Sequence, residues 1–410
     1  MFAPRTRPAA FAGAIAALVL LAGCGKGAHG QTTAQSGGPV HKVAPVVAQG
    51  AVSVATRNTT RVGGAVVAAD AAGVARTVYP GLTVATRPLL VVIADERNFS
   101  AALAASIFAA SPTNAPILYS EGESLPEVTS QTLRAMDPVG DPALGGAQVL
   151  RIGSTTPVPS GYVTRTIPAT GPAPTAAALA QAFIGVAGPL HQVIVVPANA
   201  PPALLMPAAG LSAESGAPIL FVTPSRVPEP TGNLLVSLNH PSIYLIDAAG
   251  IDGPTRHELR RLGHVKTVTQ GSASEPNPAV AGSIAVARYT DGVFGWGVKE
   301  PGHGLVFANS GRPMDAPAAA LLSSTGNYGP LLLLESPTVI APSLAAYLGD
   351  IQPAYTSAPE YRPVRGVYNH GWLIGDELAI SAVTQAELDS LLEISPRKQG
   401  SEEQTAAPAE

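Results

Sequence analysis

Three stretches of the sequence repeat one order of elements: an apolar strand, a small-residue helix and a second strand that opens on proline. We expect the first strands at 90–94, 193–196 and 305–308, and the Ala-rich helices at 100–110, 202–213 and 314–323. The second strands begin with the motifs Pro116-Ile117-Leu118, Pro218-Ile219-Leu220 and Pro330-Leu331-Leu332. The same 24 positions separate residue 91 from 115, 193 from 217 and 305 from 329. A spacing that recurs three times predicts three copies of one structural unit.

Each copy continues with further elements of the same kinds. A second helix is expected at 126–136, 230–238 and 341–348, and a third strand at 149–152, 243–246 and 372–374. One more helix precedes each copy, at 66–78, 174–184 and 278–289. Alternating helices and continuous apolar strands are typical of parallel sheets covered on both faces. The sequence therefore predicts an α/β fold of three tandem β-α-β-α-β units, at 61–165, 166–271 and 272–395, each a small parallel sheet flanked by helices.

These residues resemble the cell wall binding repeat type 2 family, whose repeats occur in tandem threes on surface proteins of Gram-positive bacteria. The first unit carries Arg61-Val62-Gly63-Gly64, Asn98-Phe99-Ser100-Ala101-Ala102-Leu103 and the Pro116 motif. The third carries Pro313-Met314-Asp315-Ala316-Pro317, Pro330-Leu331-Leu332-Leu333, Ile374-Gly375 and a closing helix at 384–394. The resemblance covers residues 60–394 approximately. It implies that three units pack with pseudo-threefold symmetry and hold the protein non-covalently to anionic cell-wall polymers. The expected ligand is a teichoic-like chain, and peptidoglycan is the alternative.

The chain departs from the family pattern at two kinds of position. The aspartate of the family's Pro-Asp-Ala-Leu segment is matched only by Asp315, since Ala101 and Ala203 stand near the other two positions. The family's glycine pair after the third strand is reduced to Gly153-Ser154, Asp247-Ala248 and Gly375-Asp376. We therefore expect the fold of the family to carry over better than its ligand specificity does.

Candidate polymer-binding residues come from the resemblance and from the strand ends. The family's Pro-Ile-Leu-Leu-like motif is linked to polymer binding, which points to the three proline motifs above; core packing is the alternative for these apolar residues. A phosphate polymer also needs cationic donors, and ligands of open parallel sheets bind beyond the carboxyl ends of the strands. Arg97, Arg226 and Arg312 follow such ends, and the arginine fork suits phosphate and carboxylate groups. Solvated surface arginines are the alternative.

The first residues have the pattern of a lipoprotein export signal. Arg5 and Arg7 precede an apolar run at 9–21, which leads into Leu21-Ala22-Gly23-Cys24. A positive start, an apolar stretch and small residues before a cysteine predict a signal peptide over 1–23 and lipidation of Cys24. The alternatives are a plain secretory signal cut elsewhere and an uncleaved anchor helix. We expect a flexible spacer over 24–60, which is composed mainly of small and polar residues with little periodicity. We expect a disordered tail over 396–410, because it lacks residues that a core could bury.

Composition limits the remaining classes. Because Cys24 is the only cysteine, the chain has no intrachain disulfide and no thiolate metal cluster. A hydrophobic content of 46% with 13% charged residues indicates a globular protein with a sizeable core. A net charge of −4 argues against nucleic-acid binding and leaves any polymer binding to local groups. No other segment reaches the ~20 apolar residues of a membrane-spanning helix.

Catalytic motifs are weak. Gly25-Lys26-Gly27-Ala28-His29-Gly30 matches the dinucleotide fingerprint, but no strand precedes it and no helix follows. His257-Glu258 begins like a zincin helix, but Arg261 stands where the second histidine should be. We therefore expect a non-catalytic protein without cofactor or metal. With its lipid on Cys24, we expect it on the outer face of the cytoplasmic membrane, facing the cell wall. The alternatives are a lipid-anchored receptor for small solutes and a cell-wall hydrolase, since a Ser-His-Asp triad can also assemble in space.

Overall fold

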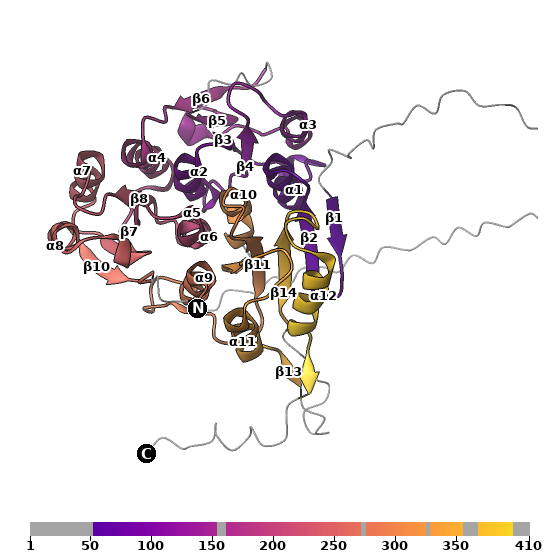
Figure 1. Ribbon diagram of the computed structural model, residues 1–410. Helices are drawn as coiled ribbons and strands as arrows, with labels where there is room; N and C mark the ends of the chain where they lie inside the picture. Colours follow the sequence, from indigo (N-terminus) through magenta and orange to yellow (C-terminus); the bar gives the residue numbers. More distant parts are fainter. Residues whose placement is uncertain (1–51, 154–160, 272–275, 325–328, 356–367, 397–410) are drawn as a thin grey trace, which may run out of the picture. The chain divides into compact units, whose positions relative to one another are not determined.

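Parallel sheets form the frame of the computed structural model, which describes residues 52–153, 161–271, 276–324, 329–355 and 368–396 (Figure 1). The first sheet has the order β4 (Ile117–Ser120), β3 (Val91–Asp95), β5 (Val149–Ile152), β6 (Thr164–Ile167). The second has the order β8 (Ile219–Val222), β7 (Gln192–Pro197), β9 (Ser242–Leu245), β10 (His264–Thr267). The third has the order β12 (Leu331–Leu334), β11 (Gly304–Asn309), β14 (His370–Ile374), β2 (Thr59–Gly63), and β1 (Val52–Ala55) adds an antiparallel edge.

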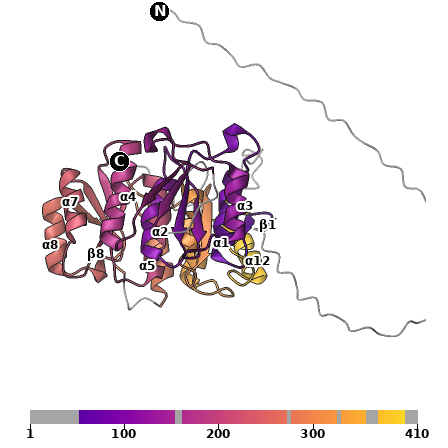
Figure 2. The ribbon, with the colours of Figure 1, turned by 90° about the horizontal axis from the view of Figure 1, so that it is seen from above.

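Three helices lead from one sheet to the next: α1 (Val67–Val78), α4 (Pro172–Ala187) and α9 (Pro278–Arg288). Helix α1 follows β2 and packs on β4, α4 follows β6 and packs on β8, and α9 follows β10 and packs on β12. Beside them lie α3 (Glu127–Met136), α7 (Glu229–Ser237) and α11 (Pro342–Asp350). Two more helices, α8 (Gly253–Leu262) and α12 (Ala382–Leu391), follow β9 and β14. Seen from above, α7 and α8 lie at one end, and α3 and α12 at the other (Figure 2).

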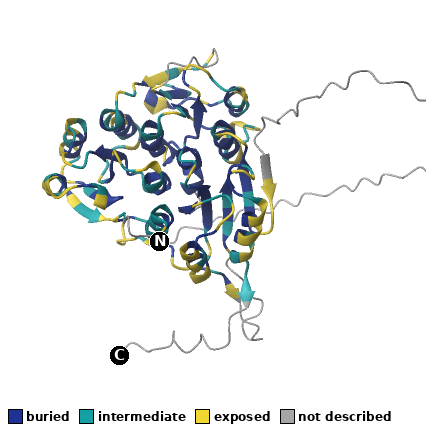
Figure 3. Cartoon of the chain, in the orientation of Figure 1, coloured by how far each residue is buried: buried dark blue, intermediate teal, exposed yellow. Residues whose placement is uncertain are grey.

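Small residues allow three helices to meet between the sheets. These helices are α2 (Phe99–Ala105), α6 (Pro207–Ser215) and α10 (Asp315–Ala319), which contact one another and lie together in Figure 1. A Cβ atom on Gly210 of α6 would lie only 2.7 Å from the Ser323 Oγ, so a larger residue here would force the Ser323 side chain to move. The rings of Phe108 and Phe183 pack edge to face with centroids 5.7 Å apart and join the first unit to the second. The Ala-rich stretches of the sequence are thus the central contact between units, and Figure 3 shows this region as buried.

The third sheet is completed by the opposite end of the described chain. β2 lies parallel to β14, with Thr60 opposite Trp372 and Val62 opposite Ile374. A Cβ atom on Gly63, whose φ is +124°, would lie 2.2 Å from the Asp70 Oδ1 and 2.9 Å from the Gly375 nitrogen. Only glycine therefore lets β2 pass so close to α1 and β14. The first described residues of the chain, those of β1 and β2, therefore complete the third sheet.

The expected α/β fold with small parallel sheets flanked by helices is confirmed. The fourth strand of each sheet is missing from the sequence prediction. β6 and β10 are partly exposed edge strands with too few apolar residues, and β2 is buried but has the sequence TTRVG, in which Val62 is the one apolar side chain. Residues 52–60, expected as spacer, form β1 and the start of β2, and the expected unit boundary after 165 falls inside β6. The pseudo-threefold packing of the units stays a prediction.

The helix expected over 202–213 is two helices, α5 (Pro202–Leu205) and α6. Pro207 lacks a backbone N–H and therefore interrupts the helical hydrogen bonds. The helices expected over 100–110 and 314–323 each begin as a short α-helix and end as a 3-10 helix, at Ser106–Ala109 and Ala320–Ser323. The first strand and the second strand of each unit nevertheless lie within a residue or two of the expected positions.

The two ends of the chain carry several sequence predictions that stay untested. Cys24, the signal peptide over 1–23, the spacer up to residue 51 and the tail from residue 397 lie outside the described residues. Within the described ranges, no helix combines the length and the apolar character needed to cross a membrane. Residue 396, expected to begin the tail, belongs to β15 (Ser395–Pro396), which pairs with β13 (Ala354–Tyr355).

Candidate functional site

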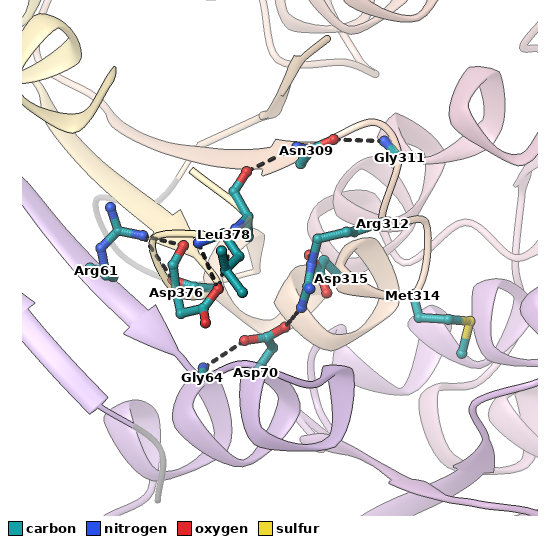
Figure 4. A network of polar contacts seen from close by, with 12 residues as sticks. Arg61, Gly64, Asp70, Asn309, Gly311, Arg312, Met314, Asp315, Asp376 and Leu378 are labelled. Atoms are coloured by element: carbon teal, nitrogen blue, oxygen red, sulfur yellow. Dashed lines mark hydrogen bonds and ion pairs between the residues drawn. The ribbon is translucent and has the colours of Figure 1, made fainter. Parts of the chain in front are cut away.

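A cluster of buried charges lies beyond the carboxyl ends of β2, β11 and β14 (Figure 4). Asp70 of α1 and Asp315 at the start of α10 are both 0% exposed. Arg312, in the loop after β11, donates from Nε to the Asp315 Oδ2 over 2.9 Å and from Nη2 to the Asp70 Oδ2. The other Asp70 oxygen accepts the backbone N–H of Gly64 over 2.8 Å. The cluster therefore connects the end of β2 with the first helix of the body and with the third unit.

Burial dominates the electrostatics of this cluster. Desolvation raises the pKa of Asp70 even though Arg312 and the Gly64 N–H oppose it. Desolvation and the nearby Asp70 raise the pKa of Asp315 well above its ordinary value. Burial by itself lowers the pKa of Arg312, but the two carboxylates more than offset this and raise it. Arg312 thus stays charged, and the protonation of the two carboxyls is what the site can change.

A buried arginine, Arg61, holds the neighbouring loop. Arg61 of β2 is 5% exposed, and its Nη1 donates to the backbone oxygens of Gly375 (3.0 Å) and Asp376 (2.7 Å). Its Nη2 donates to the Ile380 oxygen over 2.7 Å and its Nε to the Gln385 Oε1 over 3.1 Å. Burial lowers the pKa of Arg61. This arginine of the expected Arg-Val-Gly-Gly motif is therefore a structural tie between β2 and the segment after β14.

The positions after the three third strands share an uncommon backbone conformation. Gly153 has a φ of +65°, Asp247 of +55° and Gly375 of +98°. Aspartate is among the few non-glycine residues that tolerate this left-handed region. The substitution of glycine by Asp247 therefore keeps the turn, and it places a carboxyl that is 6% exposed beside the second sheet, where burial raises its pKa.

The proline motifs lie inside the protein. Pro116, Pro218 and Pro330 each accept a backbone N–H from the first strand of their sheet. The strand residues are at most 2% exposed: Ile117, Leu118, Ile219, Leu220, Leu331 and Leu332. A ligand cannot reach these side chains in the folded protein, so the geometry favours the core-packing reading of the motifs.

The three candidate arginines have different surroundings. Arg97 is 66% exposed and forms a two-pronged pair with Asp95, with N–O distances of 3.0 and 2.8 Å. Arg226 is exposed at the turn after β8, and its guanidinium makes no hydrogen bond or ion pair with any described residue. Arg312 is 22% exposed and is committed to two buried carboxylates. The structure therefore leaves Arg97 and Arg226 accessible to a polymer and gives Arg312 an internal role.

A hollow of about 240 Å³ opens at the carboxyl edge between the second and third units. Pro201, Ala203 and Leu204 line it from the second unit, and Asn277 and the first turn of α9 line it from the other side. Ser310 and Glu335, which directly follow β11 and β12, complete the wall. The lining is mostly apolar and carries no arginine.

The loop after α9 covers part of the second sheet. Asp291 accepts hydrogen bonds from the Tyr244 hydroxyl (2.9 Å) and from the Lys266 Nζ (2.5 Å), and Phe294 stacks on Tyr244 with ring centroids 3.6 Å apart. Burial alone would raise the pKa of Asp291, but Lys266 and the other donors lower it to about 2. This loop is a second charged contact between units.

Replacing Asp291 with asparagine is expected to lower the free energy of unfolding at pH 7 by about 1 kcal/mol. This is less than the pKa shift of Asp291 alone would give, because Lys266 is partly exposed and water screens the ion pair. The pKa of Asp291 is depressed in the folded state, so its contribution is present above the unfolded value of 3.8 and is lost as the pH falls through about 2. Urea unfolding at pH 7 and between pH 4 and pH 2 measures this. The exposed pair of Asp350 and Arg288 supplies the control Asp350→Asn, and a stability gap that persists at pH 2 contradicts the prediction.

Sequence reasoning did not identify Asp70 or the structural role of Arg61. Asp70 is an acidic residue within the Ala-rich α1, and a charge on the buried face of a helix is the signal that could have found it. Among the described residues, no group of three or more His, Cys, Asp or Glu side chains could hold a metal ion.

Comparison with known proteins identifies the fold. No protein-family model matches the sequence, and no curated protein matches it. Cwp6 from Clostridium difficile is similar in structure, with a TM-score of 0.62 and 16% identity over 84% of this chain and 51% of that chain. Cwp8 from Clostridium difficile has a TM-score of 0.58 and 15% identity over 82% of this chain and 53% of that chain. The chain thus shares the fold of about half the length of these two proteins.

Proposed function

We propose that this protein is a non-catalytic cell-envelope protein whose three units bind cell-wall polymer. The fold similarity to the cell wall proteins Cwp6 and Cwp8 over more than four fifths of the chain is the observation that carries the proposal. The sequence resemblance to the cell wall binding repeat type 2 family points to the same role. An exported location fits both, and we propose Cys24 as the lipid anchor that keeps the body at the outer face of the membrane.

The exposed arginines are the proposed polymer contacts. Arg97 and Arg226 follow the carboxyl ends of β3 and β8, the edge at which parallel sheets receive ligands. Their guanidinium groups can pair with phosphate or carboxylate groups on a wall polymer. Asp95 already neutralises Arg97, so Arg226 is the stronger candidate.

Replacing Arg226 with alanine is expected to weaken binding of the protein to isolated cell walls about tenfold, since a charge-assisted hydrogen bond contributes on the order of 1.4 kcal/mol. Replacing Arg97 should have a smaller effect because its aspartate partner already competes for it. Sedimentation with walls at increasing salt measures both, and the affinity should fall as salt screens the contacts.

Arg134 provides the matched control. It is 53% exposed, is paired with Glu127, and lies in the last turn of α3, away from the carboxyl edge of the sheet. Arg134→Ala should bind walls as the unchanged protein does. Equal losses for Arg134→Ala and Arg226→Ala would exclude a contact at the carboxyl edge. Release of soluble wall fragments would favour the hydrolase, and stabilisation by a small solute without wall binding would favour the solute receptor.

A further inference from the structure

We propose that Asp70 and Asp315 share one proton at neutral pH, so that these carboxyls and Arg312 form a neutral buried clasp between the first helix and the third unit. The proposal does not depend on the ligand of the protein. It rests on the positions of three side chains that come from distant parts of the chain.

The charge of the cluster favours one retained proton. Two ionised carboxylates and one guanidinium would leave a net negative charge among groups of which both carboxyls are 0% exposed. An uncompensated charge in such an environment is strongly unfavourable, and two carboxylates that share a site cannot both ionise easily. One retained proton makes the cluster neutral.

The hydrogen bonds of the four carboxyl oxygens leave one oxygen free to carry this proton. Arg312 donates to the Oδ2 atom of each aspartate, and the Gly64 N–H donates to the Asp70 Oδ1. The Asp315 Oδ1 is buried, and no donor among the described residues reaches it. An oxygen without a donor is the position at which a carboxyl can carry its own proton. Burial and the nearby Asp70 raise the pKa of Asp315 well above its ordinary value, which agrees with a proton on Asp315.

No neighbouring group among the described residues can replace this proton. Tyr119 of β4 faces the pair, but its hydroxyl donates to the Met314 backbone oxygen over 2.5 Å. Arg76 of α1, Glu214 of α6, and Glu127 and Arg134 of α3 are exposed. The elements α2, β11 and the 3-10 helix after α10 carry no charged residue. Arg61 is engaged with backbone oxygens, and Asp376 accepts the N–H groups of Leu378 and Ala379.

The location of the clasp determines what it holds. Asp70 belongs to α1, which packs against α10, and its bond to Gly64 fixes the end of β2. Loss of the shared proton would leave a net negative charge at this contact and weaken it. The contact between the first helix and the third unit is therefore expected to become less stable as the proton is lost.

Two substitutions of the same kind separate the roles of the two aspartates. In Asp315→Asn, the amide oxygen can still accept from Arg312 and the amide NH₂ can donate to Asp70, so the variant imitates the protonated acid. In Asp70→Asn, one of the two acceptor positions becomes an NH₂ group that faces the Arg312 or Gly64 donor. We expect Asp315→Asn to fold normally and Asp70→Asn to unfold at a clearly lower denaturant concentration at every pH.

The pH dependence gives the decisive measurement. The pKa of Asp315 is raised in the folded state, so the stability that it contributes is full below the unfolded value of 3.8 and declines as the pH rises toward the folded value. Asparagine has no proton to lose. The folding equilibrium constant of Asp315→Asn, relative to the unchanged protein, should therefore rise about tenfold per pH unit between pH 5 and pH 7.

Urea unfolding of both variants and of the exposed control Asp350→Asn tests the proposal, together with infrared spectra at pH 7. The carbonyl band of a protonated carboxyl should be present in the unchanged protein and in Asp350→Asn and absent from Asp315→Asn. Parallel stability curves for Asp315→Asn and the unchanged protein, or failure of Asp315→Asn to fold, would overturn the proposal. A stable Asp70→Asn would overturn the assignment of the proton to Asp315.

Discussion

Arg61→Ala is expected to lower the free energy of unfolding by about 4 kcal/mol, because it leaves buried backbone oxygens without donors. Arg61 supplies hydrogen bonds to the carbonyls of Gly375, Asp376 and Ile380 and to the Gln385 side chain. Its own burial costs free energy, which keeps the net effect below the sum of the single bonds. Urea unfolding at pH 7 measures the difference.

Arg61→Lys is the informative companion. A lysine keeps the positive charge but has a single ammonium group, which cannot imitate the planar fork that reaches the three carbonyls. We expect it to recover less than half of the loss. Full recovery by lysine would mean that charge rather than directed hydrogen bonding holds β2 to the segment after β14.

Arg312→Ala is expected to cost about 3–5 kcal/mol, since it removes the only cation that contacts Asp70 and Asp315 among the described residues and leaves a buried negative charge. Urea unfolding measures the loss. Its effect on wall binding should be no larger than the unfolded fraction explains, because the guanidinium is turned inward to its two partners. A loss of wall binding by fully folded Arg312→Ala would mean that Arg312 contacts the polymer directly.

A double substitution checks the cause of that loss. In Arg312→Ala with Asp70→Asn, the buried charge is removed, and the amide introduced at position 70 can accept from Gly64 and donate to Asp315. The two effects should therefore be non-additive, with the double variant more stable than Arg312→Ala alone. Additive losses would show that Arg312 stabilises the protein through packing rather than through its charge.

Much of the fold could be predicted because short apolar runs and repeated prolines in the sequence mark its buried strands. The continuous apolar runs of β3, β7 and β11 identify buried parallel strands, and the repeated proline marks where β4, β8 and β12 begin. The edge strands β6 and β10 could not be predicted in this way, since half-exposed polar residues carry no apolar periodicity. These strands are placed by backbone pairing with strands of the same sheet, β6 with β5 and β10 with β9.

The candidate site was only partly predictable. Arg97, Arg226 and Arg312 were selected by one rule, their position after a strand, and the structure separates them by what surrounds each one. Arg97 pairs with Asp95, which is only two positions away, so this ion pair could be predicted from the sequence. Arg312 pairs with Asp70, which lies 242 positions away, and no local pattern joins the two.

The sequence by itself determined the first and second strands of each expected unit and the small residues of the central helices, because hydrophobic periodicity and residue size act between near neighbours. Only the tertiary structure decided that β2 closes the third sheet, that the proline motifs are out of reach of a ligand, and that Arg61 and Arg312 are internal ties. The physical reason is that burial, charge compensation and parallel strand pairing depend on groups brought together from distant parts of the chain.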